Sequence, residues 1–167
     1  MSKTVLNIKV ITVSDTRTQE TDKSGNVLVD RVQAAGHSLL GKRIIPDDVY
    51  HLRAEVSAHI ADPEVQVVLM TGGTGFTDRD NTHYAIAPLL ETPIEGFGEL
   101  FRQISFEEIG SSTIQSRAFA GLTNKTIIFC VPGSPGACAT AWDKIIEAQL
   151  NSSHKPCNFV DKLVSDA

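Results

Sequence analysis

The amino-acid sequence predicts an α/β fold in which two layers of helices cover a mostly parallel sheet, giving a three-layer αβα arrangement. Apolar, β-branched segments alternate with helical patterns along the chain, and that alternation is typical of a parallel sheet. The segments 65–70 and 126–131 are almost continuously apolar, as strands are when both faces of the sheet are covered. The length of 167 residues suits one core, so we expect a single domain over 1–167.

The strands and the first two helices follow from local patterns. The first helix is expected over Ser24–Ala35, with Ser24 as its N-cap and Gly36 at its C′ position. A second helix is expected to begin after Asp48, as its N-cap, and to reach about Ala61. Four strands are expected, at Val5–Val13, Ser38–Ile45, Val65–Met70 and Thr126–Val131.

The second half of the chain is more irregular. A helix over Thr82–Leu90 contains Pro88, which predicts a break in its regularity. Phe97, Leu100, Phe101 and Ile104 share one helical face, and Ser112–Ala120 is expected to form another short helix.

The last helix has the clearest signals. Ser134 is its expected N-cap and Pro135 lies in its first turn. Its apolar stripe places Cys138 and Trp142 in the core. The tail 151–167 is expected to pack against the body or against a neighbouring subunit.

Composition and charge exclude several classes of protein. The chain has 15 basic and 20 acidic residues, a net charge of -5, which argues against a nucleic-acid partner. No apolar run approaches the ~18 residues of a membrane span, so no membrane partner is expected. The N-terminus lacks a signal-like apolar segment, and three cysteines have no paired spacing. These features predict a reduced, cytoplasmic protein.

Acidic residues are concentrated between positions 46 and 108. This segment holds 12 acidic residues and only three arginines. Either these acids form a solvated acidic surface, or some of them face a divalent cation.

Polar segments follow each of the four expected strands, at 14–17, 46–48, 71–80 and 132–136, and the last two are rich in glycine. Because parallel strands end at the same edge of a sheet, these segments are expected to meet there. Folds of this type bind ligands at that edge.

The segment 71–80 combines glycines, hydroxyls and carboxylates. Three glycines in four positions, Gly72, Gly73 and Gly75, leave backbone N–H groups free to surround an anion, although a tight turn is an alternative explanation. An anion site beside Asp78 and Asp80 calls for a cation such as Mg²⁺. Alternatively, Asp80 or Asn81 caps the next helix.

The turn 132–136 opens the last helix. Its free N–H groups and the helix dipole suit a second anion site, or Ser134 is simply a helix cap. The histidines and cysteines lack zinc-binding spacing, and there is no Gly-x-Ser-x-Gly segment of a serine hydrolase.

Together these motifs resemble the MoaB/MogA molybdopterin-binding family of molybdenum cofactor biosynthesis. The resemblance covers nearly the whole chain, and its most specific segments are 71–75, 79–82, 96–99 and 116–117. Segments 106–110 and 113–118 are most similar to the B-type members. The resemblance implies a Rossmann-like fold of the MoaB/MogA type and a homotrimer or homohexamer.

The resemblance also implies a reaction. The terminal phosphate of molybdopterin attacks the α-phosphate of Mg-ATP, giving adenylyl-molybdopterin and pyrophosphate. Asp47 and Asp80 match two acidic positions that matter in active relatives, so both are the expected catalytic residues and ligands of Mg²⁺. Some B-type members lack this pair.

Further residues are expected to bind the substrates ATP and molybdopterin. Backbone groups of the glycine-rich segment would hold phosphate, Ser116 and Arg117 would lie on the side of the pterin phosphate, and Gly133 and Ser134 could serve either ligand. The full set is Ser14, Asp15, Arg17, Thr71, Gly72, Gly73, Thr74, Gly75, Ser116, Arg117, Gly133 and Ser134. Two alternatives remain: a non-catalytic molybdopterin-binding or scaffold protein of the same pathway, and an unrelated nucleotide-binding module.

Overall fold

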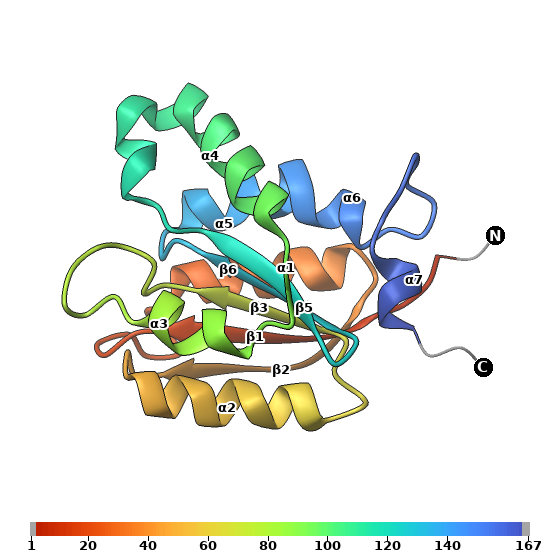
Figure 1. The fold of residues 1–167 in the computed structure, drawn as a ribbon, viewed down its shortest axis with the longest axis horizontal. Coiled ribbons are helices and arrows are strands. Elements are labelled where there is room, and N and C mark those ends of the chain that lie inside the picture. The colour runs from red at the N-terminus through yellow and green to blue at the C-terminus, as the bar shows by residue number, and fades with distance from the viewer. Residues whose placement is uncertain (1–2, 165–167) are drawn as a thin grey trace.

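Six strands form one sheet in the computed structural model, which describes residues 3–164 (Figure 1). The strands lie in the order β2-β1-β3-β6-β5-β4. The first four in that order are parallel: β2 (Ser38–Ile45), β1 (Asn7–Val13), β3 (Val67–Thr71) and β6 (Thr126–Val131). β5 (Phe119–Thr123) and the two-residue β4 (Thr92–Pro93) complete the sheet as an antiparallel edge.

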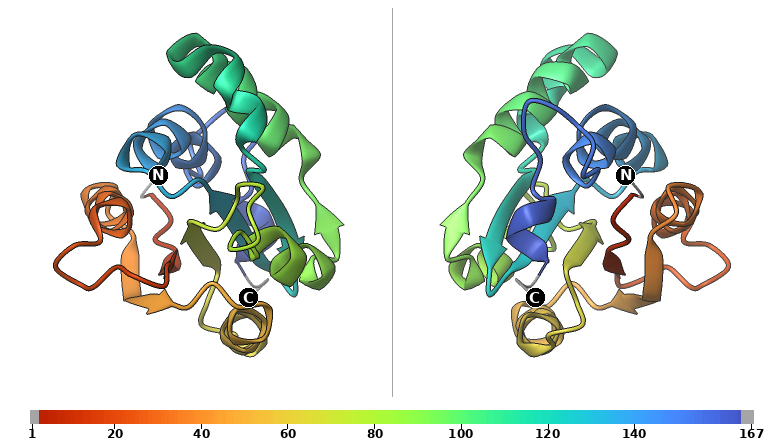
Figure 2. Two further views of the ribbon diagram at one scale, coloured as in Figure 1. Left: turned by 90° about the vertical axis from the view of Figure 1, so that its left-hand side faces the viewer. Right: turned by 90° about the vertical axis from the view of Figure 1, so that its right-hand side faces the viewer.

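Helices cover both faces of this sheet, as the end-on views show (Figure 2). One face carries α1 (Lys23–Ala34), α4 (Glu95–Ile109) and α5 (Pro135–Ala141), which continues through a π-helical turn, Trp142–Ile146, into α6 (Glu147–Gln149). The other face carries α2 (Val49–Ala61) and α3 (Thr82–Ile86), which a 3₁₀ turn, Ala87–Leu89, extends. The prediction of a three-layer fold around a mostly parallel sheet is confirmed.

The core is divided by the sheet into two clusters. Successive side chains of a strand point to opposite faces, so Ile8 and Val10 pack with α1, α4 and α5, whereas Ile11 and Val13 pack with α2 and α3. Every residue of β3 and β6 is buried, because both faces of these central strands are covered. Trp142 and Cys138 are buried as predicted, and burying a large apolar side chain contributes roughly 1.5–3 kcal/mol.

Three of the four residues predicted to cap a helix end do so in the structure. Asp48 caps α2 by accepting hydrogen bonds from Tyr50 N–H and His51 N–H, and Ser134 caps α5. Gly36, at a φ of +80°, ends α1 in the left-handed conformation that glycine allows.

The fourth capping residue, at the N-terminus of α1, was predicted wrongly. Asp22, not Ser24, caps α1, and its carboxylate accepts a hydrogen bond from Gly25 N–H at 2.9 Å. Asp22 is held in that position by Thr12 of β1 and by Lys42 of β2. These two partners are distant in sequence, so local pattern could not identify the cap.

The predicted helix over 112–120 was also wrong. The chain there forms a 3₁₀ helix, η2 (Gly110–Gln115), and then enters β5, whose backbone pairs with β6. The pairing partner decided the conformation of residues 119–123, and periodicity alone did not reveal it. The irregularity predicted near Pro88 is confirmed, since Pro88 lies in the 3₁₀ turn that ends α3.

The described part of the tail packs on the body of the molecule. A short helix, α7 (Val160–Leu163), buries Val160 and Leu163 in the same cluster as α1 and α5. It lies at the opposite end of the sheet from the loop that follows β3 (Figure 1). Residues 165–167 of the predicted tail lie outside the described part of the chain. None of the helices within residues 3–164 has the length and apolarity needed to cross a membrane.

Candidate functional site

The four parallel strands end at one edge of the sheet, so the four polar segments predicted to meet there do meet. Ser14 follows β1, Asp47 follows β2, Gly72 follows β3 and Gly133 follows β6. The chain passes from β1 to β2 on one side and later returns to β3 on the other side of β1. That reversal is the place where open α/β sheets bind ligands.

A cavity of about 480 Å³ opens at this edge, a volume within the usual range of ligand sites. We call it the main cavity. Its floor combines Asp47, the glycine-rich segment 72–75, Asp80 and the turn 132–134. Its far wall comes from α4 and η2 and consists of Phe101, Ser105, Ile109, Ser112, Gln115 and Ser116. Of these wall residues, only Ser116 was predicted from the sequence to belong to the site. No local sequence pattern indicates that α4 lies over this edge of the sheet.

Asp47 is a nearly buried carboxylate, 8% exposed. Its Oδ1 accepts a hydrogen bond from Asn81 N–H at 2.9 Å. Its Oδ2 makes no hydrogen bond within residues 3–164, and a Cβ built on Gly73 would lie 3.1 Å from that oxygen. Burial raises the pKa of Asp47, and the charges of Asp15 and Asp80 add to that effect. One oxygen of this carboxylate therefore has no hydrogen-bond donor within residues 3–164, and the hydrogen bonds from Asn81 offset only part of the effect of burial.

Asp80 lies across the same cavity but in a different environment. It is half-buried, and its Oδ2 accepts hydrogen bonds from Thr77 N–H at 2.9 Å and Thr77 Oγ1 at 2.7 Å. Burial favours a higher pKa for Asp80, but hydrogen bonds from Thr77 and Gly75 and the charge of Arg117 outweigh it and lower the pKa. Asp80 is held in its ionised form.

Two glycines of the loop after β3 are required by its shape. Gly72 has a φ of +103° and Gly73 a φ of +68°, conformations that other residues rarely adopt. A Cβ on Gly72 would overlap the carbonyl oxygen of Val13, and one on Gly73 would overlap the hydroxyl of Thr82. These contacts support the tight-turn explanation, and because Gly72 N–H already donates to Val131 O at 3.0 Å, an anion site in this loop stays a prediction.

Thr82 is a site residue that sequence reasoning missed. It is fully buried, and its hydroxyl donates a hydrogen bond to Gly72 O at 2.8 Å while its N–H donates to Gly73 O at 3.0 Å. These bonds tie the glycine-rich loop to the start of α3. The sequence signal was segment 79–82, which carries part of the family resemblance and from which only Asp80 was assigned a role in the site.

Arg117 holds the loop from the other side and does not line the main cavity. Its N–H donates to Thr74 O, and its Nη2 donates to Gly75 O and to Asp80 O. Its guanidinium lies over the rings of Phe76 and Tyr84, 4.8 and 5.2 Å from their centroids. In this structure Arg117 positions the loop, and its place beside the pterin phosphate stays a prediction.

The remaining predicted residues lie behind or beside the main cavity. Asp15 accepts hydrogen bonds from Arg79 and from Asp47 N–H, so it links the segment after β2 to the loop that precedes α3. Ser14, Arg17 and Thr71 line a second, smaller cavity.

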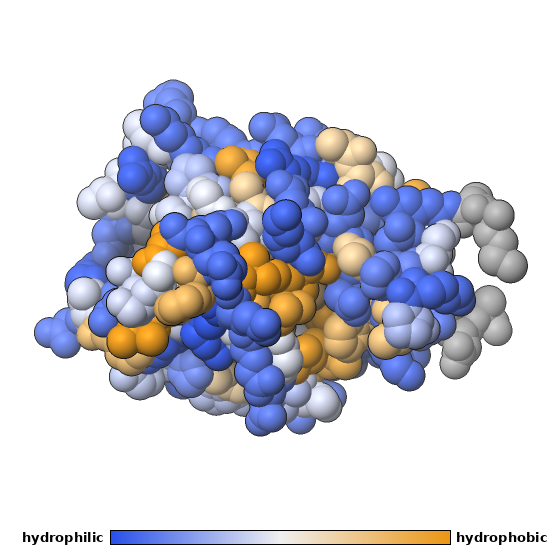
Figure 3. All heavy atoms as spheres, turned by 90° about the horizontal axis from the view of Figure 1, so that it is seen from above, coloured by the Kyte–Doolittle hydropathy of each residue, from blue (hydrophilic) through white to orange (hydrophobic). Residues whose placement is uncertain are grey.

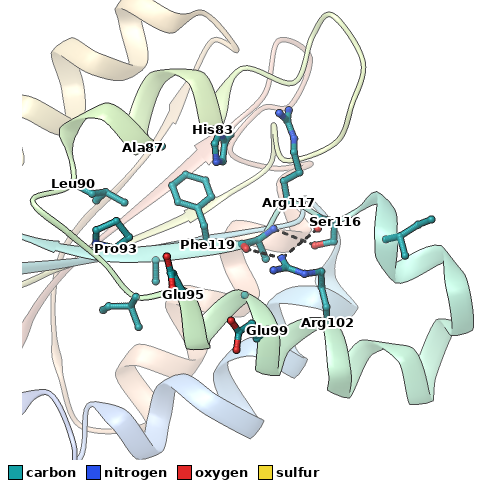
Figure 4. A pocket seen from close by; sticks show the side chains of 15 residues that line it. His83, Ala87, Leu90, Pro93, Glu95, Glu99, Arg102, Ser116, Arg117 and Phe119 are labelled. Atoms are coloured by element: carbon teal, nitrogen blue, oxygen red, sulfur yellow. Dashed lines mark hydrogen bonds between the residues drawn. The ribbon is translucent and has the colours of Figure 1, made fainter.

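A wider hollow of about 720 Å³ lies between α3 and α4 (Figure 4). His83, Leu90 and Phe119 form much of its lining, and Arg102 donates a hydrogen bond to Ala118 O at 3.0 Å. This hollow shares Ser116 with the main cavity, and Arg117, which holds the glycine-rich loop, also lines it.

Large apolar side chains are also exposed, among them Phe106, Ile109 and Ile114. One face of the molecule shows an apolar area between hydrophilic residues (orange and blue in Figure 3). Such areas often mark interaction surfaces. The homotrimer or homohexamer stays a prediction.

Any divalent cation at the main cavity would be held by few protein ligands. Within residues 3–164, no group of three or more His, Cys, Asp or Glu side chains is placed to hold a metal ion. Asp47 and Asp80 are the carboxylates that line the cavity, so the remaining ligands would be substrate oxygens and water.

Comparison with known proteins identifies the family. Residues 9–152 match a family model described as "Probable molybdopterin binding domain". This chain belongs to that molybdopterin-binding family of molybdenum cofactor biosynthesis. It is 54% identical over 152 residues to molybdenum cofactor biosynthesis protein B of Escherichia coli (strain K12), covering 91% of this chain and 89% of that one.

Other family members agree in sequence and in fold. The B protein of Bacillus subtilis (strain 168) is 46% identical over 147 residues, covering 87% of this chain and 86% of that one. A crystal structure of molybdenum cofactor biosynthesis protein B superimposes with a TM-score of 0.87 at 44% identity, covering 90% and 94% of the two chains. The resemblance noted from the motifs, and the fold expected from it, are confirmed.

Proposed function

We propose that this protein catalyses the Mg-ATP-dependent adenylylation of molybdopterin, giving adenylyl-molybdopterin and pyrophosphate. One observation carries the proposal: Asp47 and Asp80, which follow different strands, line the same cavity as the glycine-rich backbone and the N-terminal turn of α5. Carboxylates beside anion-binding backbone repel the anion unless a cation lies between them. Mg²⁺ in proteins is commonly bound by one or two carboxylates together with substrate phosphates.

The residues present fit such a cation. Asp47 Oδ2 has no hydrogen-bond donor within residues 3–164, and burial makes its negative charge costly. A cation near that oxygen would offset the cost. When bound, Mg²⁺ would neutralise charge on the phosphate oxygens of ATP.

The chain itself would bind and orient the two substrates. Gly73 and Thr74 of the glycine-rich loop line the cavity, and their N–H groups donate to no acceptor within residues 3–164, so these groups suit a phosphate. Phe101 and Ile109 supply an apolar wall, and Ser112, Gln115 and Ser116 supply polar groups on the same side, a mixture that suits a pterin ring.

The reaction needs no nucleophile from the protein. The phosphate oxygen of molybdopterin forms the new bond to the α-phosphorus, and the bond from that phosphorus to the bridging oxygen breaks as pyrophosphate leaves. Positioning and charge neutralisation carry most of the catalysis in such transfers.

The test is to incubate the purified protein with molybdopterin and Mg-ATP and to measure pyrophosphate and the adenylylated pterin. We expect both products from the wild type and a loss of both in Asp80→Asn. Asp78→Asn is the matched control, since Asp78 is exposed, lies two positions away and does not line the cavity. Binding of molybdopterin without either product would contradict the proposal and favour a pterin-binding scaffold.

A further inference from the structure

Asn81 contacts Asp47 from outside the main cavity. It follows Asp80 directly in the chain, is half-buried and does not line the cavity. Its backbone N–H donates a hydrogen bond to Asp47 Oδ1 at 2.9 Å, and its side-chain Nδ2 donates a second one to Asp47 O at 3.1 Å. One residue therefore holds both the carboxylate and the backbone of Asp47.

The Asn81 side chain does not make the contact that its position in the chain favours. Asn81 is the N-cap residue of α3, and an asparagine there normally accepts a hydrogen bond from the first turn of the helix. It makes no such bond. The helix is joined to Asn81 through the backbone, because Asn81 O accepts from Ala85 N–H at 2.9 Å. The side-chain amide is thus directed to Asp47 and not to α3.

The bonds from Asn81 leave one carboxylate oxygen of Asp47 without a donor. The N–H of Asp47 donates to Asp15 Oδ1 at 3.1 Å, and Asn81 holds the carbonyl oxygen and Oδ1. Rotation of the carboxylate would break the bond from Asn81 N–H. Asp47 Oδ2, which has no donor within residues 3–164, is therefore kept in one place at the main cavity.

Asn81 also links the two chain segments that carry the aspartates. Asp80 is its neighbour in the loop before α3, and Asp47 lies in the segment after β2. The Asp80 side chain is held separately, by Thr77. Mg²⁺ demands ligands in near-ideal octahedral geometry, so two carboxylates from different strands bind it well only when their relative position is fixed.

We propose that Asn81 is a positioning residue of the metal site, which holds Asp47 Oδ2 where it can bind Mg²⁺ together with Asp80. This inference rests on the proposed function for the identity of the cation and of its phosphate ligand. Asn81 acts through Asp47 and does not itself contact the substrates. Its side chain supports the site in preference to capping α3.

Calorimetric titration with ATP, in excess Mg²⁺ and again in EDTA, tests this role without relying on turnover. The ratio of the two affinities measures what the cation contributes to binding. Asn81→Ser keeps a residue that is favoured at an N-cap but removes the amide that donates to Asp47 O. We expect the ATP affinity of this variant to fall about tenfold in Mg²⁺ and to stay unchanged in EDTA, with the Tm of the wild type.

Asn7→Ser is the matched control. Asn7 Nδ2 also donates to a backbone carbonyl oxygen, that of Glu64, at 3.0 Å. Asn7 lies at the start of β1, away from the edge where the parallel strands end, and lines none of the three cavities described above. The ATP affinity of this variant should equal that of the wild type in both conditions.

A double-mutant comparison shows whether Asn81 acts through Asp47. In an Asp47→Asn background, Asn81→Ser should cause no further loss of Mg²⁺-dependent ATP affinity, because the oxygen that Asn81 positions no longer belongs to a carboxylate. A further tenfold loss in that background would overturn the inference, since Asn81 would then act on the site by another route.

The remaining outcomes separate this inference from the proposed function. If Asn81→Ser binds ATP in Mg²⁺ as the wild type does, Asn81 does not position Asp47. An equal loss in Mg²⁺ and in EDTA, or a variant that does not fold, would show that Asn81 shapes the whole loop, and either result overturns the inference. None of these results bears on the proposed function. A wild type that makes no adenylylated pterin, yet loses Mg²⁺-dependent ATP affinity in Asn81→Ser, contradicts the proposed function alone.

Discussion

Asp47 and Asp80 line one cavity and have opposite electrostatic environments. Asp47 is nearly buried, accepts one backbone hydrogen bond on its carboxylate and lies near two other acids, so its pKa is raised. Asp80 is half-buried and accepts two hydrogen bonds from Thr77, so its pKa is lowered. The balance between burial, hydrogen-bond donors and nearby charges, more than residue type or a place at a strand end, decides in which direction the pKa of each carboxylate moves.

Because their environments differ, the two aspartates would respond differently to a bound cation. The lowered pKa of Asp80 favours its ionised form without any ligand, whereas a cation near Asp47 would offset the cost of burying its charge. A site with one preorganised carboxylate and one that responds to the cation would bind the metal most tightly together with substrate.

The largest expected effect is on turnover. Asp80→Asn and Asp47→Asn should each lower the rate of pyrophosphate release by about 100- to 1,000-fold, because each removes a charge that faces the cation, an effect of several kcal/mol. Asp78→Asn should keep the wild-type rate. An Asp47→Asn variant with full activity would show that only Asp80 takes part in the reaction.

A smaller effect is expected from Arg117, which positions the loop that carries Asp80. Arg117→Lys should lower kcat/KM about tenfold, because a single ammonium group cannot donate to Gly75 O and Asp80 O and also stack on two rings. Arg31→Lys serves as the control, since Arg31 pairs with Asp143 on the surface. Equal activity in the two variants would mean that the loop keeps its shape without Arg117.

The two aspartates should also differ in their effect on stability. Asp80 has a lowered pKa in the folded protein, so its charge stabilises the fold above the unfolded pKa, and that contribution is lost as pH falls through the lower folded pKa. Asp47 has a raised pKa, so its contribution is present at low pH and is lost as pH rises through the folded pKa.

Thermal unfolding at pH 7 without Mg²⁺ measures that contrast. Asp80→Asn should lower Tm by a few degrees, since a hydrogen bond to a charged group contributes roughly 1.5–3 kcal/mol. Asp47→Asn should leave Tm unchanged or raise it. A fall in Tm of equal size for both variants would remove the contrast between them.

The smallest effect concerns the donors around Asp80. Thr77→Val removes one of the two Thr77 hydrogen bonds and should raise the pKa of Asp80 toward its ordinary value. The acid limb of the Asp80 titration, followed by carboxyl carbon NMR, should therefore move to higher pH. Thr92→Val, on the exposed edge strand β4, should leave it in place.

Sequence patterns predicted the parts of this protein that depend on local spacing. The four parallel strands were found within two residues of their bounds, because continuous apolar runs are typical of strands covered on both faces. The same reasoning placed Asp47, Asp80 and the glycine-rich segment at one edge. The carboxyl ends of parallel strands lie at one edge of the sheet whatever the strand order. The fold class alone therefore predicted which segments form the floor of the main cavity.

Contacts between distant residues decided the rest. Asp22 replaced Ser24 as the cap of α1 because Thr12 and Lys42 hold its carboxylate. Phe119–Thr123 forms a strand because its backbone pairs with β6. The Arg117 guanidinium donates hydrogen bonds to the carbonyl oxygens of Gly75 and Asp80.

The sequence by itself therefore determined the strands, the loops between them and the residue types at the edge where the parallel strands end. These features follow from the spacing of apolar and polar residues along the chain. Only the tertiary structure decided which carboxylate is stabilised by hydrogen bonds and which arginine supports the loop. Those properties depend on donors and charges brought together by packing, and no local pattern records them.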